Sequence, residues 1–345
     1  MVFSKTLLDW YQANKRELPW RNTREPYLIW LSEIMLQQTR VAQGLPYFMA
    51  FTEAFPTVFD LANADEQEVL KLWQGLGYYS RARNLHQTAK YIANELGGLF
   101  PTTYNDLLKL KGVGEYTAAA IASFSYDEAV PVVDGNVYRV LSRFFGLETD
   151  ISSSGAKKEF TSLAKSVMPN DKAALFNQAI MEFGALQCVP KNPDCESCVF
   201  NGSCAALQQH KVDLLPIKTK KTKVSNRYFN YLVFLDSNEQ TIIRKRTEKG
   251  IWQHLYEFPL IESNKELSYE ELLGEITLHF PHKTIENISY FNEDQIIHKL
   301  SHQKLHIRFY RIALSKKILN GISLETLKNY PFPVVIFNFI NNYSI

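Results

Sequence analysis

The sequence predicts a multidomain protein, in which an all-α domain (residues 1–208) is joined by a linker (209–227) to an α+β domain (228–345). In the first part, apolar residues recur at helical spacing between Pro and Gly residues, as in residues 28–35. The linker is polar and has no hydrophobic face. Beyond it, short β-rich runs surround one helix-like segment, which predicts the α+β domain.

Length and composition agree with this organisation. A chain of 345 residues with 46% hydrophobic and 21% charged residues is typical of soluble globular proteins, not of disordered ones. The formal net charge is only +2, so any nucleic-acid partner must be inferred from local features. No stretch reaches about 18 uncharged apolar residues, which argues against a membrane span.

The first 20 residues read as a folded helix and not as an export signal. Lys5, Asp9, Lys15 and Arg16 interrupt their apolar residues, so a signal peptide is not expected. Four cysteines without an export signal indicate a reducing compartment. We therefore expect the protein to be located in the cytoplasm of a bacterium.

The linker allows two interpretations. Pro216 is followed by Lys218, Lys220, Lys221 and Lys223. Either a solvated tether or contact with phosphate explains these lysines, because a block of like charge is unspecific.

The C-terminal region is expected to alternate strands with one helix. Residues 268–280, SYEELLGEITLHF, are expected to be helical. The expected strands are Tyr231–Leu235, Thr241–Ile243, Tyr256–Ile261, His306–Leu314 and Val334–Phe339.

All the cysteines of the chain lie in one short segment, with the spacing C-x6-C-x2-C-x5-C. They are Cys188, Cys195, Cys198 and Cys204. Four thiolates this close can complete one tetrahedral ligand shell, which fits either a 4Fe-4S cluster or a structural zinc ion. The spacing alone does not choose between them, but buried core thiols would not require it.

A second motif is the segment Leu110–Thr117, which contains Gly112 and Gly114. Two glycines permit a tight turn between helices, and the N-terminus of the following helix offers backbone N–H groups to a DNA phosphate. A plain turn between two helices is the alternative, because short glycine patterns are common.

Taken together, these motifs resemble the helix-hairpin-helix DNA glycosylase superfamily over nearly all of residues 1–208. The cysteine spacing matches its iron-sulfur branch, so the resemblance implies a 4Fe-4S cluster held by the loop 188–204. It also implies that Asp134, in Val132–Val137, is the catalytic aspartate that follows the hairpin in this family.

Two positions separate the branches of this superfamily. The endonuclease III branch has a lysine nucleophile in the hairpin, and the matching residue here is Tyr116. A phenol cannot form a Schiff base, so a monofunctional glycosylase is expected. The segment Trp30–Thr39 resembles the helix that carries the catalytic glutamate in the adenine-specific branch, the MutY family, which makes Glu33 the expected acid.

A pair of carboxyl groups suits the removal of adenine. Adenine leaves easily only when protonated, and cleavage of its bond to deoxyribose places positive charge on the sugar. A protonated Glu33 can donate to N7 of a flipped adenine, while an ionised Asp134 stabilises or transiently attacks the oxocarbenium ion. The resemblance further implies that Tyr116 forms hydrogen bonds in the site and that Asn136 lies nearby. As isolated residues, Glu33 fits a solvent-facing helix and Asp134 a helix cap.

The segment Arg16–Arg21 resembles the wall of the family's adenine pocket. Trp20 and Arg21 would stack on and hydrogen-bond to a flipped base. Gln178 and Glu182 are weaker candidates for the same pocket, since a surface helix face explains them almost as well.

Flipping a base leaves a gap in the stack that side chains usually fill. Gln38 and Tyr78 match family positions that insert near the unpaired base, although Tyr78 also fits a core aromatic residue. Arg81 and Arg83 fit either phosphate contact or a solvated helix face.

The C-terminal domain resembles a Nudix-like domain at Gly250–Pro259. A hydrolysing Nudix enzyme would continue into a helix with the motif R-E-x-x-E-E, but Glu270, Glu271 and Glu275 do not form this motif. We therefore expect a module that recognises DNA and does not hydrolyse pyrophosphate.

Residues 300–302 align with the family's Phe-Ser-His loop, which recognises 8-oxoguanine opposite adenine. Leu300 replaces the aromatic residue, and Lys111 stands in the hairpin where many relatives have proline. Ser301 can read the Hoogsteen edge of the base, and His302 can hold the loop or contact a phosphate. A turn hydroxyl is the plain alternative for Ser301.

The sequence thus predicts a monomeric adenine DNA glycosylase whose partner is double-stranded DNA with A:8-oxoG or A:G mispairs, and not a membrane. The second most favoured function is that of a thymine or other mismatch glycosylase of the same superfamily. A catalytically silent damage binder would not need Glu33, Asp134 and Tyr116 together. A nucleotide pyrophosphohydrolase would need the absent metal-binding motif.

Overall fold

The computed structural model describes residues 2–219, 223–281 and 283–342, which form two compact units. The N-terminal unit comprises Met1–Asn63 and Asn84–Lys220, and the C-terminal unit comprises Ala64–Arg83 and Lys221–Ile345. Residues 64–83 therefore pack with the C-terminal segment of the chain, and α6 runs across the boundary between the units.

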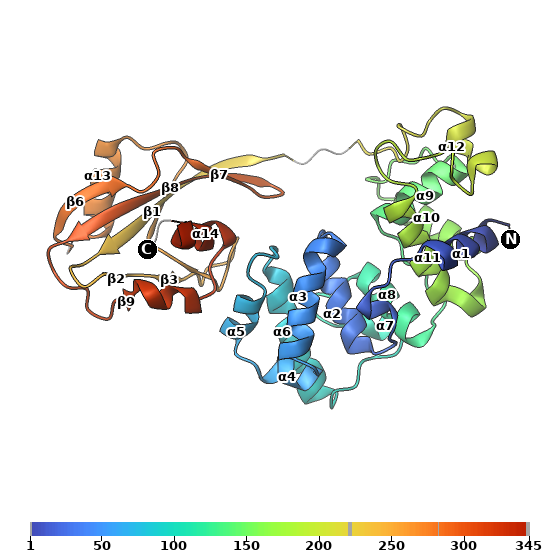
Figure 1. Cartoon of the computed structure of the whole chain (residues 1–345), viewed down its shortest axis with the longest axis horizontal. Coiled ribbons are helices and arrows are strands. Elements are labelled where there is room, and N and C mark those ends of the chain that lie inside the picture. The colour runs from blue at the N-terminus through green and yellow to red at the C-terminus, as the bar shows by residue number, and fades with distance from the viewer. Residues whose placement is uncertain (1, 220–222, 282, 343–345) are drawn as a thin grey trace. The chain divides into compact units, whose positions relative to one another are not determined.

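The N-terminal part of the chain is helical, as predicted (Figure 1). Its α-helices are α1 (Val2–Asn14), α2 (Pro26–Leu36), α3 (Val41–Ala54), α4 (Val58–Asn63), α5 (Glu66–Leu72), α6 (Ser80–Glu95), α7 (Tyr104–Leu107), α8 (Glu115–Tyr126), α9 (Gly135–Phe145), α10 (Ala156–Val167), α11 (Ala173–Leu186) and α12 (Ala205–Gln208). Short 3-10 turns are η1 (Pro19–Arg21), η2 (Asn170–Lys172) and η3 (Asn201–Ser203).

Local signals in the sequence start the helices that carry the expected catalytic residues. Proline is favoured at the first position of a helix, where its missing N–H is not needed, and Pro26 begins α2. Asp134 caps α9 by accepting hydrogen bonds from the backbone N–H groups of Asn136 and Val137. The buried faces of α1, α9, α10 and α11 form a continuous apolar core that fixes these elements relative to one another.

The C-terminal unit is built on a five-stranded mixed sheet with the order β5-β1-β8-β6, in which β7 also pairs with β8. Its strands are β1 (Ser225–Leu235), β5 (Leu260–Ser263), β6 (Ile285–Tyr290), β7 (Ile296–Lys299) and β8 (Gln303–Leu314). Two small sheets pair β2 (Gln240–Thr241) with β9 (Ile322–Ser323), and β3 (Arg244–Lys245) with β4 (Tyr256–Glu257). The remaining elements are α13 (Tyr269–His279), η4 (Leu324–Asn329) and α14 (Val334–Asn342).

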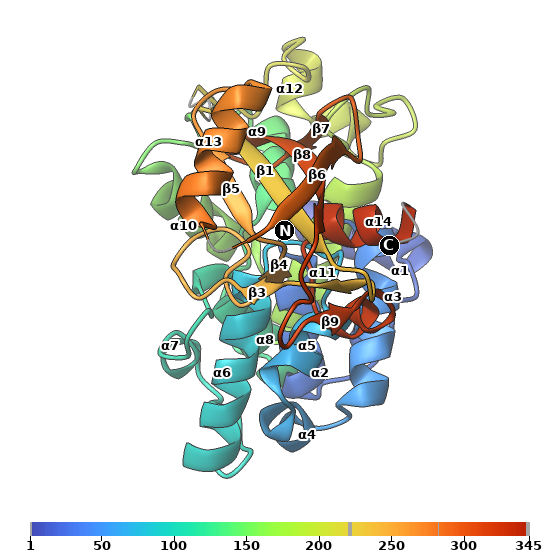
Figure 2. The ribbon, with the colours of Figure 1, turned by 90° about the vertical axis from the view of Figure 1, so that its left-hand side faces the viewer.

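A helix packs on each face of this sheet (Figure 2). Successive side chains of a strand point to opposite faces. On one face, Leu232 and Ile312 pack with Leu272 of α13. On the other face, the ring of Phe309 stacks on Phe339 of α14 with 3.7 Å between ring centroids. The unit is therefore a helix-sheet-helix sandwich.

The expected strand Val334–Phe339 is wrong, because these residues belong to the helix α14. The β-branched residues favoured a strand, yet the buried positions Val335, Ile336, Phe339 and Ile340 recur at helical spacing. Pro333 precedes the helix, and its carbonyl accepts the first helical hydrogen bonds, from Ile336 and Phe337.

The other predictions for this unit are closer to the structure. The expected helix over 268–280 is α13, whose start is fixed by a capping box of Ser268 and Glu271. The expected strand Tyr256–Ile261 is divided into β4 and β5, since Pro259 lacks the N–H that a strand ladder uses. Only Thr241 of the expected strand 241–243 is in a strand.

The residues expected to be a linker have specific contacts at their start. The backbone N–H of Ile151 donates to the carbonyl of Ile217 at 2.9 Å, and Thr219 hydrogen-bonds to Asp150. Regular structure resumes at Ser225 in β1. Lys220 and Lys221 lie outside the described residues.

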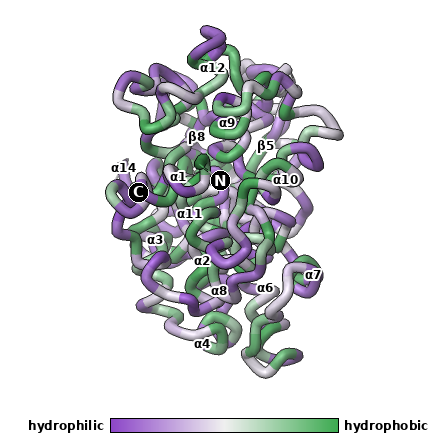
Figure 3. Tube along the Cα trace, turned by 90° about the vertical axis from the view of Figure 1, so that its right-hand side faces the viewer, coloured by the Kyte–Doolittle hydropathy of each residue, from purple (hydrophilic) through white to green (hydrophobic). Residues whose placement is uncertain are grey.

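Hydrophobic and hydrophilic residues follow one another along the helices of the chain (Figure 3). In α9, Val137, Val140 and Leu141 lie in the core, and the partly exposed Tyr138 and Phe144 pack against it. Within the described ranges, no helix is both long enough and apolar enough to cross a membrane.

Candidate active site

The N-terminal unit contains a pocket between α2, α8, α9 and α11. Six of the residues predicted from the sequence line it: Trp20, Arg21, Glu33, Tyr116, Asp134 and Asn136. Gln178 and Glu182, which were weaker candidates, also line it. The pocket therefore collects residues that are up to about 160 positions apart in the chain.

Glu33 lies on α2, whose residues are mostly buried, and only 6% of Glu33 is exposed. Burial raises the pKa of Glu33 to about 7, and the nearby charge of Asp134 acts in the same direction. A hydrogen bond from Tyr116 and the charge of Arg21 oppose the shift. A carboxyl group with this pKa can hold and release a proton near neutral pH.

Tyr116 lies in the first turn of α8 and hydrogen-bonds to Glu33. Burial raises the pKa of Tyr116 well above its ordinary value, and the charges of Glu33 and Asp134 add to the shift. The phenol therefore stays neutral and acts as a hydrogen-bond donor to the carboxyl group of Glu33.

Asp134 accepts hydrogen bonds on both carboxylate oxygens. Its Oδ1 accepts from the backbone N–H groups of Asn136 and Val137, each at 2.8 Å, and its Oδ2 accepts from Nδ2 of Asn136 at 2.7 Å. Burial raises the pKa of Asp134, whereas these three donors and the charge of Arg139 lower it. The donors hold the carboxylate in one orientation at the edge of the pocket and favour its charged form.

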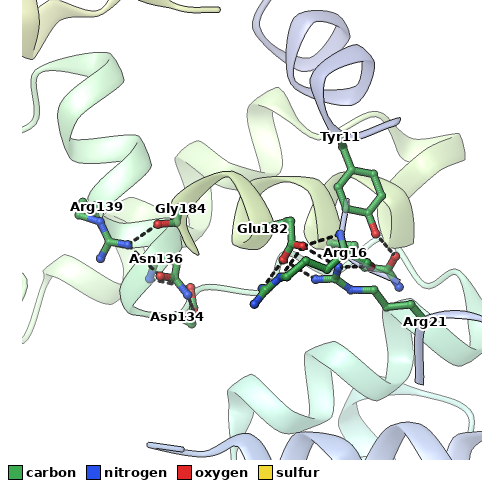
Figure 4. A network of polar contacts seen from close by, with 9 residues as sticks. Tyr11, Arg16, Arg21, Asp134, Asn136, Arg139, Glu182 and Gly184 are labelled. Carbon is green, nitrogen blue, oxygen red and sulfur yellow. Dashed lines mark hydrogen bonds and ion pairs between the residues drawn. The ribbon is translucent and has the colours of Figure 1, made fainter. Parts of the chain in front are cut away.

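A buried carboxylate holds two arginines at the other side of the pocket (Figure 4). Glu182 on α11 is 1% exposed and accepts hydrogen bonds from both guanidinium groups and from the backbone N–H of Arg16. Burial alone would raise the pKa of Glu182, but the hydrogen bonds from Arg16 and Arg21 lower it to about 2. Glu182 therefore fixes the position of Arg21 in the pocket.

The neighbours of this network are also fixed. Tyr11 donates a hydrogen bond to Oε1 of Gln178 at 2.9 Å, and the Trp20 ring packs edge-on against Phe48 with 5.0 Å between centroids. Sequence analysis did not single out Arg16 for this site. Its only signal there was its position beside Trp20 and Arg21 in the same short segment.

A second residue that sequence analysis missed is Arg139 on α9. Its guanidinium donates to Oδ1 of Asn136 at 2.8 Å and to the carbonyls of Gly184 and Cys188, each at 2.6 Å. Arg139 thus connects the cysteine segment with Asn136, which in turn holds Asp134. Arg139 follows Asn136 by three residues on one helix, and this spacing could have predicted a contact between the two side chains.

Gly184 allows α11 to approach Asn136 closely. A Cβ atom on Gly184 would lie 2.7 Å from Cβ of Asn136 and 3.1 Å from its Cα. A larger residue would push the two helices apart and displace the amide that holds Asp134.

The four cysteines line one pocket beside α9 and α11, together with Arg143 and Phe200. Backbone and side-chain N–H groups point at their sulfurs: Arg143 donates to Cys188 Sγ and the Phe200 amide to Cys198 Sγ, each at 3.5 Å. N–H groups directed at sulfur stabilise thiolate ligands of a metal centre. The donor set and its surroundings therefore fit a thiolate-bound cofactor.

The expected hairpin connects α7 and α8; its residue Tyr116 lines the pocket, whereas Gly112 and Gly114 do not. Gly112 has a φ of +76°, and a Cβ atom there would lie 2.7 Å from Cβ of Asn84. Gly114 has an extended backbone with φ −87°, and a Cβ atom there would meet nothing within 4 Å. The backbone conformation and the close contact with Asn84 therefore require glycine at position 112 but not at position 114.

We expect Gly112→Ala to destabilise the fold by about 1–3 kcal/mol, because alanine is strained at positive φ and its methyl group would overlap Asn84. Gly114→Ala is the matched control and should change the free energy of unfolding by less than about 0.5 kcal/mol. Thermal or urea unfolding of both variants measures this difference. Equal stability of the two variants would contradict the assigned geometry.

The remaining predicted DNA-contacting residues are exposed. Gln38 and Tyr78 both have left-handed backbones, with φ of 55° and 48°, which is uncommon for residues other than glycine. Tyr78, Ser301 and His302 belong to the C-terminal unit, where the Tyr78 hydroxyl and Ser301 Oγ are 2.5 Å apart. The structure thus brings together two residues for which separate roles were predicted.

Comparisons with known proteins agree with this architecture. The family model "HhH-GPD superfamily base excision DNA repair protein" matches residues 31–166, and a "NUDIX domain" model matches residues 230–342. The chain is 38% identical over 307 residues to an adenine DNA glycosylase of Buchnera aphidicola subsp. Schizaphis graminum, covering 89% of this chain and 86% of that protein.

Solved structures match the helical part. A thermostable thymine-DNA glycosylase has a TM-score of 0.56 and 30% identity, covering 60% of this chain and 96% of that one. A non-covalent endonuclease III–DNA complex has a TM-score of 0.53 and 21% identity, covering 61% of this chain and 95% of that one. The latter likeness concerns the fold alone.

Proposed function

Since this chain belongs to the adenine DNA glycosylase family, we propose that it removes adenine mispaired with 8-oxoguanine or guanine from double-stranded DNA, as a step of base excision repair. The observation that carries this proposal is the pocket that holds Glu33, Tyr116 and Asp134 together, with the pKa of Glu33 raised to about 7 by burial.

The proposed reaction uses the two carboxyl groups in different protonation states. Protonated Glu33 donates its proton to N7 of the flipped adenine, and the bond from N9 to C1′ of the deoxyribose breaks with its electron pair on the base. The charged Asp134 stabilises the oxocarbenium ion or bonds transiently to C1′. Water then adds to C1′, which breaks any transient bond from Asp134, and passes a proton to the now ionised Glu33. An abasic sugar, neutral adenine and the protonated acid remain.

Several residues of the pocket support this reaction without taking part in proton transfer. Tyr116 donates to Glu33, and Asn136 holds Asp134 by a hydrogen bond of 2.7 Å. Trp20 and Arg21 would bind the flipped base, with Arg21 positioned by Glu182. Because Tyr116 cannot form a Schiff base, the chain releases the base without cutting the strand.

We propose that Cys188, Cys195, Cys198 and Cys204 hold a 4Fe-4S cluster. All four thiols line one pocket, where thiolates can bind either zinc or an iron-sulfur cluster. The resemblance of the cysteine spacing to the iron-sulfur branch of the superfamily favours the cluster. When bound, the cluster would brace the loop 188–204, with no part in the hydrolysis itself.

We assign DNA binding to both domains. The hairpin with Gly112 and Gly114 would bind a phosphate at the start of α8, and Gln38 and Tyr78 would fill the gap left by the flipped base. Ser301 and His302 would read the opposite base. One chain supplies all these residues, which supports a monomer.

The sequence boundaries at 1–208, 209–227 and 228–345 remain our proposal for the glycosylase domain, linker and lesion-recognition domain. The last is proposed to lack pyrophosphohydrolase activity. Glu271 is engaged by Lys265 at 2.6 Å, and Glu275 contacts His279 at 3.3 Å. Both carboxylates are thus paired with cations of their own surface, and the motif R-E-x-x-E-E of a hydrolysing Nudix enzyme is missing from the sequence.

Ser301→Ala should reduce the preference for adenine opposite 8-oxoguanine over adenine opposite guanine by roughly 2- to 10-fold, the value of one hydrogen bond. The base-release rate opposite guanine should change little. Ser315→Ala, an exposed serine beyond the end of β8, is the matched control. The rates of adenine release opposite 8-oxoguanine and opposite guanine are both measured with enzyme in excess. An unchanged preference would show that Ser301 does not recognise 8-oxoguanine.

Release of thymine from a T:G mispair is the alternative that the likeness to a thymine-DNA glycosylase favours. Incubation with duplexes carrying A:8-oxoG, A:G or T:G, followed by identification of the free base, separates the two functions. Free adenine from the first two duplexes and no thymine from the third is the expected result. Thymine release would replace the proposed substrate.

A further inference from the structure

Strands β7 and β8 form a hairpin (Figure 1). It carries positive charge that the proposed catalytic site does not use. Between Asp294 and Glu325 the sequence contains no Asp or Glu, although it contains several Lys and Arg residues and the whole chain has a net charge of only +2. Lys299 ends β7 and Lys304 lies near the start of β8, so these two lysines flank the turn 300–302.

The two lysines face each other across the strand pair. In the antiparallel register of β7 and β8, Lys299 is directly opposite Lys304. Like charges at directly opposite positions destabilise a sheet, because their side chains lie only about 5 Å apart at Cβ. The hairpin therefore contains a repulsion that nothing in its own fold requires.

Two arginines of the same sheet have carboxylate partners. Arg227 on β1 pairs with Glu262 at 2.6 Å, and Arg308 on β8 pairs with Glu266 at 2.8 Å. Within the parts of the chain that the structure describes, no carboxylate forms an ion pair with Lys299 or Lys304. The neutralising partner of this lysine pair is thus expected to come from another molecule.

Protection of a sheet edge explains Lys299 but does not explain Lys304. Lysines on edge strands prevent unwanted strand pairing, and β7 is an edge strand. However, Lys304 lies on β8, which pairs with β1 on its other side. A lysine on an internal strand does not protect an edge.

We propose that Lys299 and Lys304 bind phosphates of the DNA backbone beside the base that Ser301 reads. This proposal depends on the DNA-binding role given to Ser301, which lies in the turn between the two lysines. A polyanion relieves the repulsion between the lysines, and phosphate contacts fix the register of the protein on the duplex without reading sequence. Ser301 would then meet the opposite base at a fixed distance from the backbone.

The test is the salt dependence of DNA binding by the full chain. We expect the double variant Lys299→Gln/Lys304→Gln to bind DNA with a weaker salt dependence. The magnitude of the slope of log affinity against log salt should decrease by about 1.8, since each phosphate contact contributes about 0.9. The probe is an unmodified duplex, titrated between roughly 50 and 200 mM salt. Lys316→Gln combined with Lys328→Gln removes the same charge elsewhere in this unit and should leave the slope nearly unchanged.

Two outcomes would overturn the proposal. An unchanged slope in the hairpin variant would exclude DNA as the partner of this lysine pair. An equal decrease in both variants would show that only net charge matters, and not a site. In addition, the hairpin variant should melt no lower than the wild type, because a repulsion has been removed; a lower melting temperature would contradict that repulsion.

Failure of this proposal can be told apart from failure of the proposed activity. Binding to unmodified DNA requires no base release, so the slope can fall as expected even in a protein that releases no adenine. Conversely, an unchanged slope in the hairpin variant, together with adenine release by the wild type, would overturn the phosphate contacts and leave the proposed activity intact.

Discussion

Replacing Asp134 by asparagine is expected to slow adenine release by roughly 10³-fold or more, because the variant cannot place a negative charge beside the sugar. The substitution keeps the shape of the side chain. Its oxygen can still accept the hydrogen bonds from the N–H groups of Asn136 and Val137 that start α9. The measurement is the single-turnover rate of base release, with binding to the same duplex as a second readout.

Asp134→Ala separates the chemical role of this residue from its structural role. Alanine removes both the charge and the helix cap, so it should also lower the free energy of unfolding by about 1 kcal/mol. The asparagine variant keeps the helix cap and loses only the hydrogen bond from Nδ2 of Asn136, so it should be destabilised less than the alanine variant. If the asparagine variant kept a rate within tenfold of the wild type, the carboxylate would have no catalytic role.

Glu33→Gln is expected to reduce adenine release by about 10²- to 10⁴-fold, the usual contribution of a general acid. Glu33 must be protonated to act, and its pKa is raised to about 7, so the wild-type rate should fall tenfold per pH unit above pH 7. Glutamine carries no such proton. The residual rate of the variant should therefore be independent of pH in this range, and a parallel fall in both proteins would assign the titration to another group.

The same burial predicts a gain in stability when Glu33 is neutralised. Because folding raises the pKa of Glu33 from 4.5 to about 7, the ionised group destabilises the fold; its favourable contribution is complete below pH 4.5 and is lost as pH rises through 7. Glu33→Gln should consequently be more stable than the wild type at pH 8, by up to roughly 3 kcal/mol, but not at pH 4. Equal unfolding free energies at pH 8 would show that burial of the charge costs little.

The parts of the site that lie in short motifs could be predicted from the sequence. Glu33, Tyr116 and Asp134 each occur in a segment of recognisable pattern, and the structure places all three around one pocket. The capping role of Asp134 follows from the residue type before a glycine and a helix. Local patterns contain this information because they report helix starts and turns.

Contacts between distant segments could not be predicted in the same way. The pairing of Arg16 with Glu182 joins residues 166 positions apart, and that of Tyr78 with Ser301 joins residues 223 positions apart. Nothing in either local pattern specifies the partner. For the same reason, a run such as Val334–Phe339 fits a strand by composition, although its burial against the sheet requires a helix.

Arg139 shows how such contacts support the site. It links the backbone of Cys188 to Asn136, and through this amide to the carboxylate of Asp134. A change in the cysteine loop can therefore reach Asp134 through the side chains of Arg139 and Asn136. The orientation of the proposed catalytic carboxylate thus depends on contacts made by this loop.

The most direct test of the proposed function is single-turnover release of adenine from a duplex with one A:8-oxoG pair, read as strand breaks with and without alkali. We predict rapid release by the wild type, breaks only after alkali, and binding without release by Asp134→Asn. Tight and specific binding by the wild type without release would contradict a glycosylase and indicate a damage-binding protein.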